Sequence, residues 1–312
     1  MAKKIVVTTC SLHHLAQAKA LGDSILKFNP DYKLIIGLVD KLNGRVLPEY
    51  YFPHELIEVE TMHLPEFEGM YKRYTTLELN CALKSFFIDH VLNTYSPDFI
   101  FFLDSDILVF DSFKSVEAAL SDHSILVTPH ITSSFPKDDL RPQEKDILKT
   151  GIFNAGFLGL RNDSNGQSMI RWLKERMVDQ CYERPKEGLN VDQKWLNLVP
   201  LFFESVKILL HAGCNIAYWN LHERIIHKEN ERYFVNNDSL IFYHYSGFSW
   251  ERPEIISKHQ DRFRFTDFPL LKELFDFYRD ALIKNDHEKM LTQHSYFKKT
   301  KSGVLHKLGL KK

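Results

Sequence analysis

The sequence predicts an α/β fold built around a mainly parallel sheet. Short apolar segments alternate with longer segments in which apolar residues recur every three or four positions. This alternation is typical of strands joined by crossover helices, which lie parallel to one another in an open sheet. The chain has 312 residues, enough for one large α/β domain or two smaller ones, and 44% hydrophobic residues supply a substantial core.

The elements are expected in the order strand, helix, strand, strand, helix, strand. The expected strands are residues 5–9, 33–39, 55–59 and 99–104, and the helices between them are residues 12–28 and 75–91. The second helix has the clearest periodicity, because Leu79, Leu83 and Phe86 recur on one face. We expect one large domain over residues 1–265, followed by a helix and a basic tail over residues 266–312.

Two aspartates interrupt a buried strand and are the main indication of function. Asp104 and Asp106 follow the apolar run 99–103, and apolar sequence resumes at residue 107. Side chains two positions apart in an extended segment point to the same side. Two unpaired carboxylates between buried flanks are costly, and a hard divalent cation with oxygen ligands removes that cost. Ligands of open α/β sheets bind beyond the carboxyl ends of the strands, where this pair lies.

This D-x-D motif leaves several interpretations open. Two solvated acids at a strand end need no function at all. Haloacid-dehalogenase-like phosphatases use the first Asp of such a motif as a nucleophile, whereas nucleotide-sugar transferases use the motif to hold Mn²⁺ or Mg²⁺ on a diphosphate. A non-catalytic sugar-binding module is the remaining class. No G-D-x-x-x-D motif follows Asp106, and β/α structure precedes the acid pair, so a transferase is favoured over a phosphatase.

Three later segments carry side chains that suit a sugar and a metal. Asn154 lies in a glycine-containing segment and offers both a donor and an acceptor to a sugar hydroxyl. Asp192 and Gln193 begin an expected helix, for which an acidic first turn is the alternative explanation. His244 ends an expected strand at 240–244, where a core histidine is the alternative, although neutral imidazole also binds Mn²⁺.

Together these segments resemble the GT-A-fold glycosyltransferases, in particular the retaining family 8 type that includes glycogenin-like and bacterial galactosyltransferases. The resemblance rests on F-L-D-S-D at 102–106, F-N-A-G-F at 153–157, D-Q at 192–193 and H-Y-S-G at 244–247, and covers roughly residues 3–260. The chain also resembles bacterial glycosyltransferases of unknown donor through N-I-A-Y-W-N-L-H-E-R at 215–224 and S-K-H-Q at 257–260. The resemblance implies a nucleotide-diphospho-sugar transferase fold, with helices flanking a mainly parallel sheet. It also implies hexosyl transfer with retention to a hydroxyl of a cell-surface glycan, glycolipid or protein.

The same resemblance implies roles for individual residues. Asp104, Asp106 and His244 would hold Mn²⁺ or Mg²⁺, and the donor would be a nucleotide-diphosphate sugar, expected to be UDP-linked. The expected catalytic residues are Gln193, on the face of the anomeric carbon opposite the leaving group, and Asp192, a nucleophile if the reaction is a double displacement. The residues expected to contact the donor are Thr8, Thr9, Lys84, Asp104, Ser105, Asn154, Ala155, Gly156, Ser246, Gly247, Arg252 and Lys258.

Two departures from the family pattern affect the donor. Residues 8–14 lack the acid or amide that the family often uses to hold the base, which puts uracil specificity in doubt. The lysine that the family often places shortly after H-x-x-G is also missing, so Arg252 or Lys258 is expected to contact the phosphate.

Composition and the C-terminus bear on location. The net charge of −1 gives no general attraction to nucleic acid, and four cysteines without a C-x-x-C motif favour a reduced, cytoplasmic protein. Residues 294–312 contain six lysines and no acidic residue, interleaved with apolar side chains. This tail predicts peripheral contact with the anionic inner face of the cell membrane; a solvated basic end is the alternative.

Overall fold

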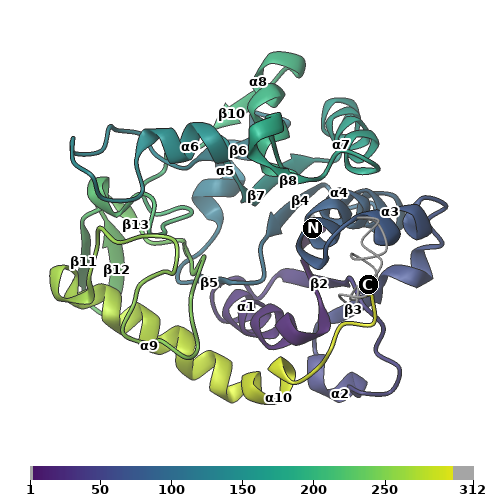
Figure 1. Ribbon diagram of the computed structural model, residues 1–312, viewed down its shortest axis with the longest axis horizontal. Helices are drawn as coiled ribbons and strands as arrows, with labels where there is room; N and C mark the ends of the chain where they lie inside the picture. The colour runs from purple at the N-terminus through teal and green to yellow at the C-terminus, as the bar shows by residue number, and fades with distance from the viewer. Residues whose placement is uncertain (1–2, 298–312) are drawn as a thin grey trace, which may run out of the picture.

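The computed structural model describes residues 3–297 and shows an α/β fold around a seven-stranded sheet (Figure 1). The strand order is β10-β6-β7-β4-β1-β2-β3. The strands are β1 (Lys4–Cys10), β2 (Tyr32–Leu38), β3 (Glu55–Glu58), β4 (Phe99–Leu103), β6 (Ile125–Pro129), β7 (Phe153–Arg161) and β10 (Val206–Ile208). Within this sheet β7 runs antiparallel to both of its neighbours, while the other neighbouring strands are parallel. The mainly parallel sheet expected from the sequence is therefore confirmed.

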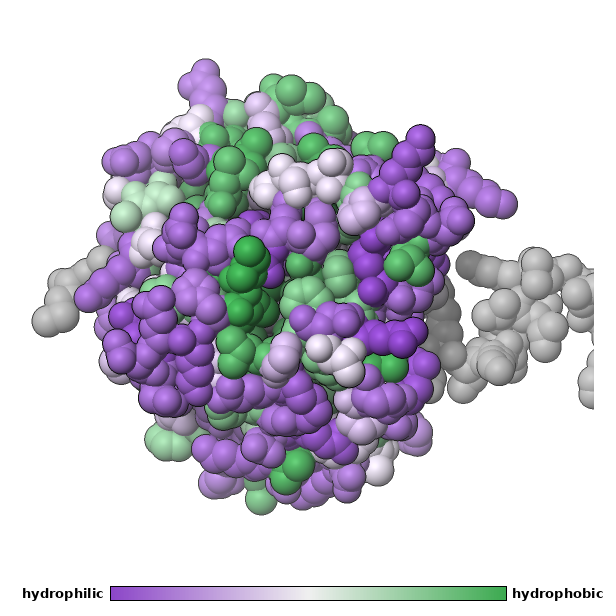
Figure 2. Space-filling view, turned by 90° about the vertical axis from the view of Figure 1, so that its left-hand side faces the viewer, coloured by the Kyte–Doolittle hydropathy of each residue, from purple (hydrophilic) through white to green (hydrophobic). Residues whose placement is uncertain are grey.

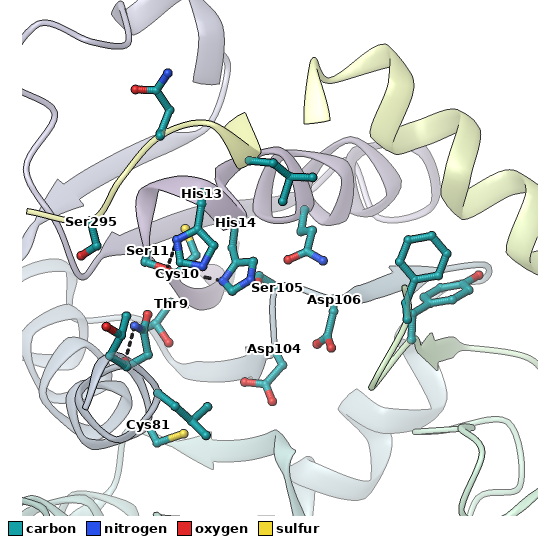
Figure 3. Close-up of a pocket in the computed structure, with 18 of the residues that line it drawn as sticks. Thr9, Cys10, Ser11, His13, His14, Cys81, Asp104, Ser105, Asp106 and Ser295 are labelled. Atoms are coloured by element: carbon teal, nitrogen blue, oxygen red, sulfur yellow. Dashed lines mark hydrogen bonds between the residues drawn. The ribbon is translucent and has the colours of Figure 1, made fainter. Parts of the chain in front are cut away.

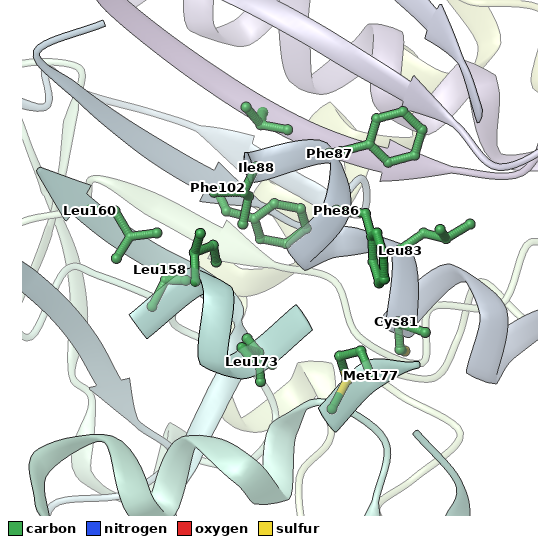
Figure 4. Packing of buried hydrophobic residues seen from close by; sticks show 14 of the residues in the cluster. Cys81, Leu83, Phe86, Phe87, Ile88, Phe102, Leu158, Leu160, Leu173 and Met177 are labelled. Carbon is green, nitrogen blue, oxygen red and sulfur yellow. The ribbon is translucent and has the colours of Figure 1, made fainter. Parts of the chain in front are cut away.

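Helices cover both faces of the sheet because side chains alternate along each strand. Val6 and Phe101 face the core shared with α1 (Leu15–Phe28) and α5 (Lys114–Ser121). Phe102, one position on, faces the core shared with α4 (Thr76–Tyr95) and α7 (Ser164–Met177). Figure 4 shows this second core, where Phe86 of α4 and Phe102 of β4 lie among aliphatic side chains of β7 and α7. The shorter helices are α2 (Pro48–Tyr51), α3 (Phe67–Arg73), α6 (Glu144–Thr150) and α8 (Val199–Phe202).

The start of α4 is fixed by a local sequence signal. Thr75 is the N-cap, and its hydroxyl accepts a hydrogen bond from the backbone N–H of Glu78 at 3.3 Å. The Glu78 carboxylate accepts in return from the N–H of Thr75 at 2.8 Å, which completes a capping box. Since Lys84 lies nine residues after this cap, the capping box sets the position of that lysine against the sheet.

A small antiparallel pair joins the two halves of the chain. β5 (Ile107–Val109) pairs with β14 (Phe242–His244), and the register places His244 opposite Ile107. Because Ile107 directly follows Asp106, the pairing brings the histidine beside the acid pair. The other short strands are β8 (Glu183–Arg184), β9 (Leu189–Asn190), β11 (Ile226–Glu229), β12 (Arg232–Val235) and β13 (Asp238–Ser239).

The helix expected after residue 265 is present as α9 (Pro269–Lys284), followed by α10 (His287–Leu291). Leu271, Leu274 and Tyr278 of α9 share a buried cluster with Tyr243 and other residues from outside that helix. The domain boundary at residue 265 stays a prediction, and the basic tail at residues 298–312 lies outside the described residues. Within residues 3–297, no helix combines the length and the apolar character needed to cross a bilayer.

The face of the molecule drawn in Figure 2 is mostly polar. On the side where β11, β12 and β13 lie, polar and charged side chains surround narrower apolar patches (Figure 2). One apolar groove of about 580 Å³ is lined by residues of β6, α6 and β10, among them Ile147, Leu148 and Ile208. It shares no lining residue with the polar cleft at the acid pair, so the two are separate surfaces.

Candidate active site

The three residues expected to bind a metal lie together. Asp104 follows β4, Asp106 precedes β5, and His244 ends β14. Each offers a ligand atom, and these atoms lie within 4.8 Å of one another. His244 Nε2 is 3.1 Å from Asp106 Oδ1, and the N–H of Tyr245 donates to the Asp106 carbonyl at 2.8 Å. Two carboxylates and one imidazole form a donor set that suits Mn²⁺, and their convergence fits such an ion.

Asp106 and His244 shift the pKa of one another. Burial alone would raise the pKa of Asp106, but the neighbouring His244 lowers it. Burial alone would lower the pKa of His244, but the Asp106 carboxylate raises it above its usual value. Because a metal ligand must be unprotonated, a metal bound here would displace a proton, and its affinity would rise with pH.

Lys84 connects the acid pair to Asp192. Its Nζ lies 2.8 Å from Asp104 Oδ1 and 3.3 Å from Asp192 Oδ2, and it donates to the carbonyl of Ala155 at 3.3 Å. Burial opposes its charge, but the two carboxylates outweigh burial and raise the pKa of Lys84 well above its usual value. Burial raises the pKa of Asp192, and Lys84 counteracts part of that rise. Lys84 is therefore a buried, permanently charged cation beside Asp104.

Amide side chains connect the metal triad to Gln193. Asn154 Nδ2 donates to Gln193 Oε1 at 3.1 Å, and Asn154 Oδ1 accepts from the N–H of Gly156 at 2.9 Å. Gln193 Nε2 donates to the carbonyl of Thr150 at 3.2 Å. The register between β6 and β7 shifts just before Thr128, which then pairs with Asn154. Asn154 and Gln193 are thus held as one unit close to His244.

Two glycines permit the close approaches that the site requires. A Cβ on Gly156 would lie 2.4 Å from Cε1 of His244, so a larger residue would displace the imidazole. Gly247 has φ +74°, and a Cβ there would lie 2.3 Å from Oγ of Ser257. Both positions therefore depend on glycine.

The acid pair faces a cleft of about 690 Å³ (Figure 3). The expected site residues that line it are Thr9, Lys84, Asp104, Ser105, Asp106, Gly247 and Lys258. The expected site residues outside this lining are Thr8, Asn154, Ala155, Gly156, Asp192, Gln193, His244, Ser246 and Arg252. Thr8 is fully buried, and Asp192 faces Lys84. Of the two candidate phosphate contacts, Lys258 therefore lies in the cleft wall and Arg252 does not.

The C-terminal strap, residues 291–297, is part of this wall, and sequence reasoning missed it. Its members that line the cleft are Leu291, Gln293, His294 and Ser295. The N–H of Tyr296 donates to Asp40 Oδ1 at 2.9 Å, and Arg45 Nη1 donates to the carbonyl of His294 at 2.7 Å. Ser295 Oγ is buried without a hydrogen-bond partner, and Ser295 lines the cleft together with Ser11 (Figure 3). The strap thus supplies polar residues to one wall of the cleft.

Comparison with known proteins identifies the fold. No protein-family model matches the chain. The chain is 26% identical over 276 residues to the uncharacterized protein YfnF of Bacillus subtilis (strain 168), covering 86% of this chain and 89% of that protein. It is 24% identical over 250 residues to YfnD of the same strain, covering 78% of this chain and 77% of YfnD.

Among solved structures, the chain is similar to the galactosyltransferase LgtC in complex with donor and acceptor sugar analogs. The TM-score is 0.53 at 16% identity, over 94% of this chain and 98% of that chain. The sheet order, the flanking helices and this similarity show that the chain has the GT-A glycosyltransferase fold, as its sequence predicts.

Proposed function

We propose that this protein is a metal-dependent glycosyltransferase of the retaining, family 8-like type. It would move a hexose from a nucleotide-diphosphate sugar to a hydroxyl of a glycan, glycolipid or protein. The nucleotide expected from the family resemblance is UDP. The observation that carries this proposal is the convergence of Asp104, Asp106 and His244, of which the two aspartates line a cleft of about 690 Å³. Such a volume is typical of a small-molecule site.

The residues around the triad suit departure of a diphosphate. When bound, Mn²⁺ or Mg²⁺ supplies Lewis-acid stabilisation of the charge that grows on the diphosphate. Lys84 and Lys258 line the same cleft and add fixed positive charge. Thr9, Ser105 and Gly247, which are also expected to contact the donor, line the same cleft.

Gln193 and Asp192 would have different roles at the sugar. The Gln193 amide is neutral and held by Asn154 and Thr150, which suits the face of an oxocarbenium-like transition state. Neither residue lines the cleft, but the Asp192 carboxylate is ion-paired with Lys84 at 3.3 Å. This placement favours front-side attack by the acceptor, whose proton passes to the leaving phosphate, over a double displacement through Asp192.

The competing classes are less well supported. A phosphatase of the haloacid-dehalogenase-like class is expected to carry a G-D-x-x-x-D motif after its acid pair, and no such motif follows Asp106. A non-catalytic sugar-binding module does not need three converging metal ligands. The GT-A fold and the histidine that completes the triad therefore favour transfer.

A panel of nucleotide sugars tests the proposal directly. With MnCl₂, at least one donor is expected to hydrolyse slowly, EDTA should stop the reaction, and NMR should show an α-anomer as the first product from an α-linked donor. A β-anomer as the first product would reject retention. If no donor is hydrolysed and no nucleoside diphosphate with Mn²⁺ raises Tm, the transferase assignment itself is wrong.

Chains of different length test the C-terminal strap. A chain ending at Leu291 keeps the buried Met290 but loses Gln293, His294 and Ser295 from the cleft wall. We expect the loss of these polar groups from the wall to weaken binding of a nucleoside diphosphate with Mn²⁺ by roughly tenfold, the effect of losing one to two hydrogen bonds of about 1 kcal/mol each. Calorimetric titration measures the affinity, and Tm without ligand shows whether the fold survives.

The matched chain ends at Phe297 and keeps the whole strap. It should bind the nucleotide like the full chain, and equal affinity in both shortened chains would exclude the strap from the site.

If the basic tail holds the protein at the cytoplasmic face of the membrane, as we propose, the full chain alone should sediment with anionic liposomes at low salt.

A further inference from the structure

Asn215 lies between the metal triad and the amides that would face the sugar. It is 1% exposed, and the function proposed above gives it no role. Its Oδ1 is 3.2 Å from His244 Nδ1, and its Nδ2 is 3.0 Å from Asn154 Oδ1 and 2.9 Å from Thr128 Oγ1. All the hydrogen-bonding atoms of this amide are therefore used within the site.

The orientation of these amides follows from one backbone group. The N–H of Gly156 can only donate, so the atom of Asn154 that lies 2.9 Å from it must be the oxygen. That oxygen must meet a donor at its second contact, so Asn215 presents its nitrogen to Asn154. The oxygen of Asn215 then faces His244 Nδ1, which must carry a hydrogen.

The consequence reaches the metal position. With a hydrogen on Nδ1, the neutral imidazole of His244 keeps its lone pair on Nε2, the atom that lies 3.1 Å from Asp106 Oδ1. A hydrogen bond on the second nitrogen fixes both the tautomer and the ring direction of a metal-binding histidine. Asn215 thus supplies the acceptor that directs Nε2 toward the acid pair.

The backbone holds Asn215 in a position that few residues adopt. Its φ is +54°, in the left-handed region that asparagine tolerates better than most residues. Asn220 Nδ2 donates to the carbonyl of Asn215 at 3.1 Å, and Asn220 Oδ1 accepts from the N–H of Ala217 at 3.0 Å. The N–H of His244 donates to the carbonyl of Ile216 at 2.7 Å. Asn215 and the histidine therefore form one fixed unit.

We propose that Asn215 is a positioning residue that couples the metal site to the sugar site. Through Oδ1 it orients His244 for the metal, and through Nδ2 it orients Asn154 and, beyond it, Gln193. This inference depends on the proposed function, since it assigns a role within that site. The residue acts through its neighbours and is not itself catalytic.

Two substitutions separate the two halves of this role. Asn215→Ala removes both contacts and should weaken Mn²⁺ binding in the presence of UDP about 10- to 100-fold. Asn215→Asp keeps an acceptor for His244 Nδ1 but places a carboxylate oxygen against Asn154 Oδ1. It should hold Mn²⁺ within about threefold of the wild-type affinity and still lose about tenfold in kcat for donor hydrolysis. Electron paramagnetic resonance of free Mn²⁺ measures the binding without any turnover.

Asn236→Ala is the matched control. Asn236 also has a positive φ, +54°, and holds two backbone groups with its amide, at Ile225 and Glu223, away from the triad. It should lower Tm without changing Mn²⁺ affinity. The inference on Asn215 is wrong if Asn215→Ala binds Mn²⁺ as tightly as the wild-type protein, or if Asn236→Ala loses as much Mn²⁺ affinity. It is also wrong if Asn215→Asp loses Mn²⁺ affinity and kcat to the same extent. These outcomes leave the proposed function intact. If the wild-type protein binds no Mn²⁺ with UDP, the proposed function falls and this inference falls with it.

Discussion

Asp106→Ala is expected to reduce donor hydrolysis by at least about a thousandfold. Loss of a metal ligand removes several kcal/mol of charge stabilisation from the transition state, and each 1.36 kcal/mol is tenfold in rate. The fold should survive, because the backbone carbonyl of residue 106 still accepts from Tyr245. Hydrolysis of the best donor and the rise in Tm on adding MnCl₂ with a nucleoside diphosphate measure the two effects.

Asp111→Ala is the matched control for this substitution. Asp111 lies five residues further along the chain, where its carboxylate pairs with Arg232 rather than with the triad. This variant should keep the response to Mn²⁺ and most of the activity. Full activity of Asp106→Ala, or of the wild-type protein in EDTA, would contradict a metal triad at these residues.

The same variant has a pH signature in EDTA. The raised pKa of His244 stabilises the fold fully below its unfolded value of about 6.5, and this contribution is lost as the pH rises through the folded pKa. The lowered pKa of Asp106 stabilises the fold above about 3.9 and is lost as the pH falls through the folded pKa. The free energy of unfolding of the wild-type protein should therefore exceed that of Asp106→Ala most between about pH 4 and 6.5, and the difference should shrink at higher pH.

Lys84→Met is expected to cost about 3–5 kcal/mol of unfolding free energy at neutral pH. Methionine fills the space of the lysine stem, but it leaves Asp192, whose side chain is 7% exposed, as a buried charge without its partner. The pKa of Asp192 is already raised by burial, and loss of the cation raises it further. The deficit should therefore grow as the pH rises and shrink as the pH falls toward 5. Urea unfolding at several pH values measures it.

The double variant Lys84→Met/Asp192→Asn tests the cause. Removing the orphaned charge should restore most of the lost stability and abolish the added pH dependence. If the double variant is no more stable than Lys84→Met, the cost arises from packing rather than from the buried charge. If Lys84→Met is as stable as the wild-type protein, the ion pairs of Lys84 with Asp104 and Asp192 contribute nothing to the stability of the fold.

Features encoded by neighbouring residues could be predicted from the sequence. The capping box at Thr75 and Glu78 fixes the start of α4, and the apolar run before Asp104 identifies β4 with its acid pair. The expected helix that begins at Asp192 is instead a 3-10 helix, Gln193–Leu198. Val191 enters it with φ +44°, and the one-turn helix α8 follows directly, with Pro200 in its first turn.

Features that depend on distant pairing could not be predicted from the residues alone. The position of His244 beside Asp106 depends on the β5–β14 register, for which only the family resemblance gave a signal. Asn215 belongs to a motif visible in the sequence, yet its role appears only when Asn154 and His244 meet it. The choice of Lys258 over Arg252 depends on the path of the chain after Gly247, whose carbonyl accepts from the Lys258 N–H at 3.0 Å.

The position of the strap in the chain has a consequence for biosynthesis. The acid pair is synthesised about 190 residues before the strap that completes its cleft. At 5–20 residues per second, the interval between them is roughly 10 to 40 s. Throughout that time the cleft lacks the wall that Gln293, His294 and Ser295 supply. A donor that needs the complete wall cannot assist folding of the emerging chain and stabilises the protein only after the strap has docked on Asp40.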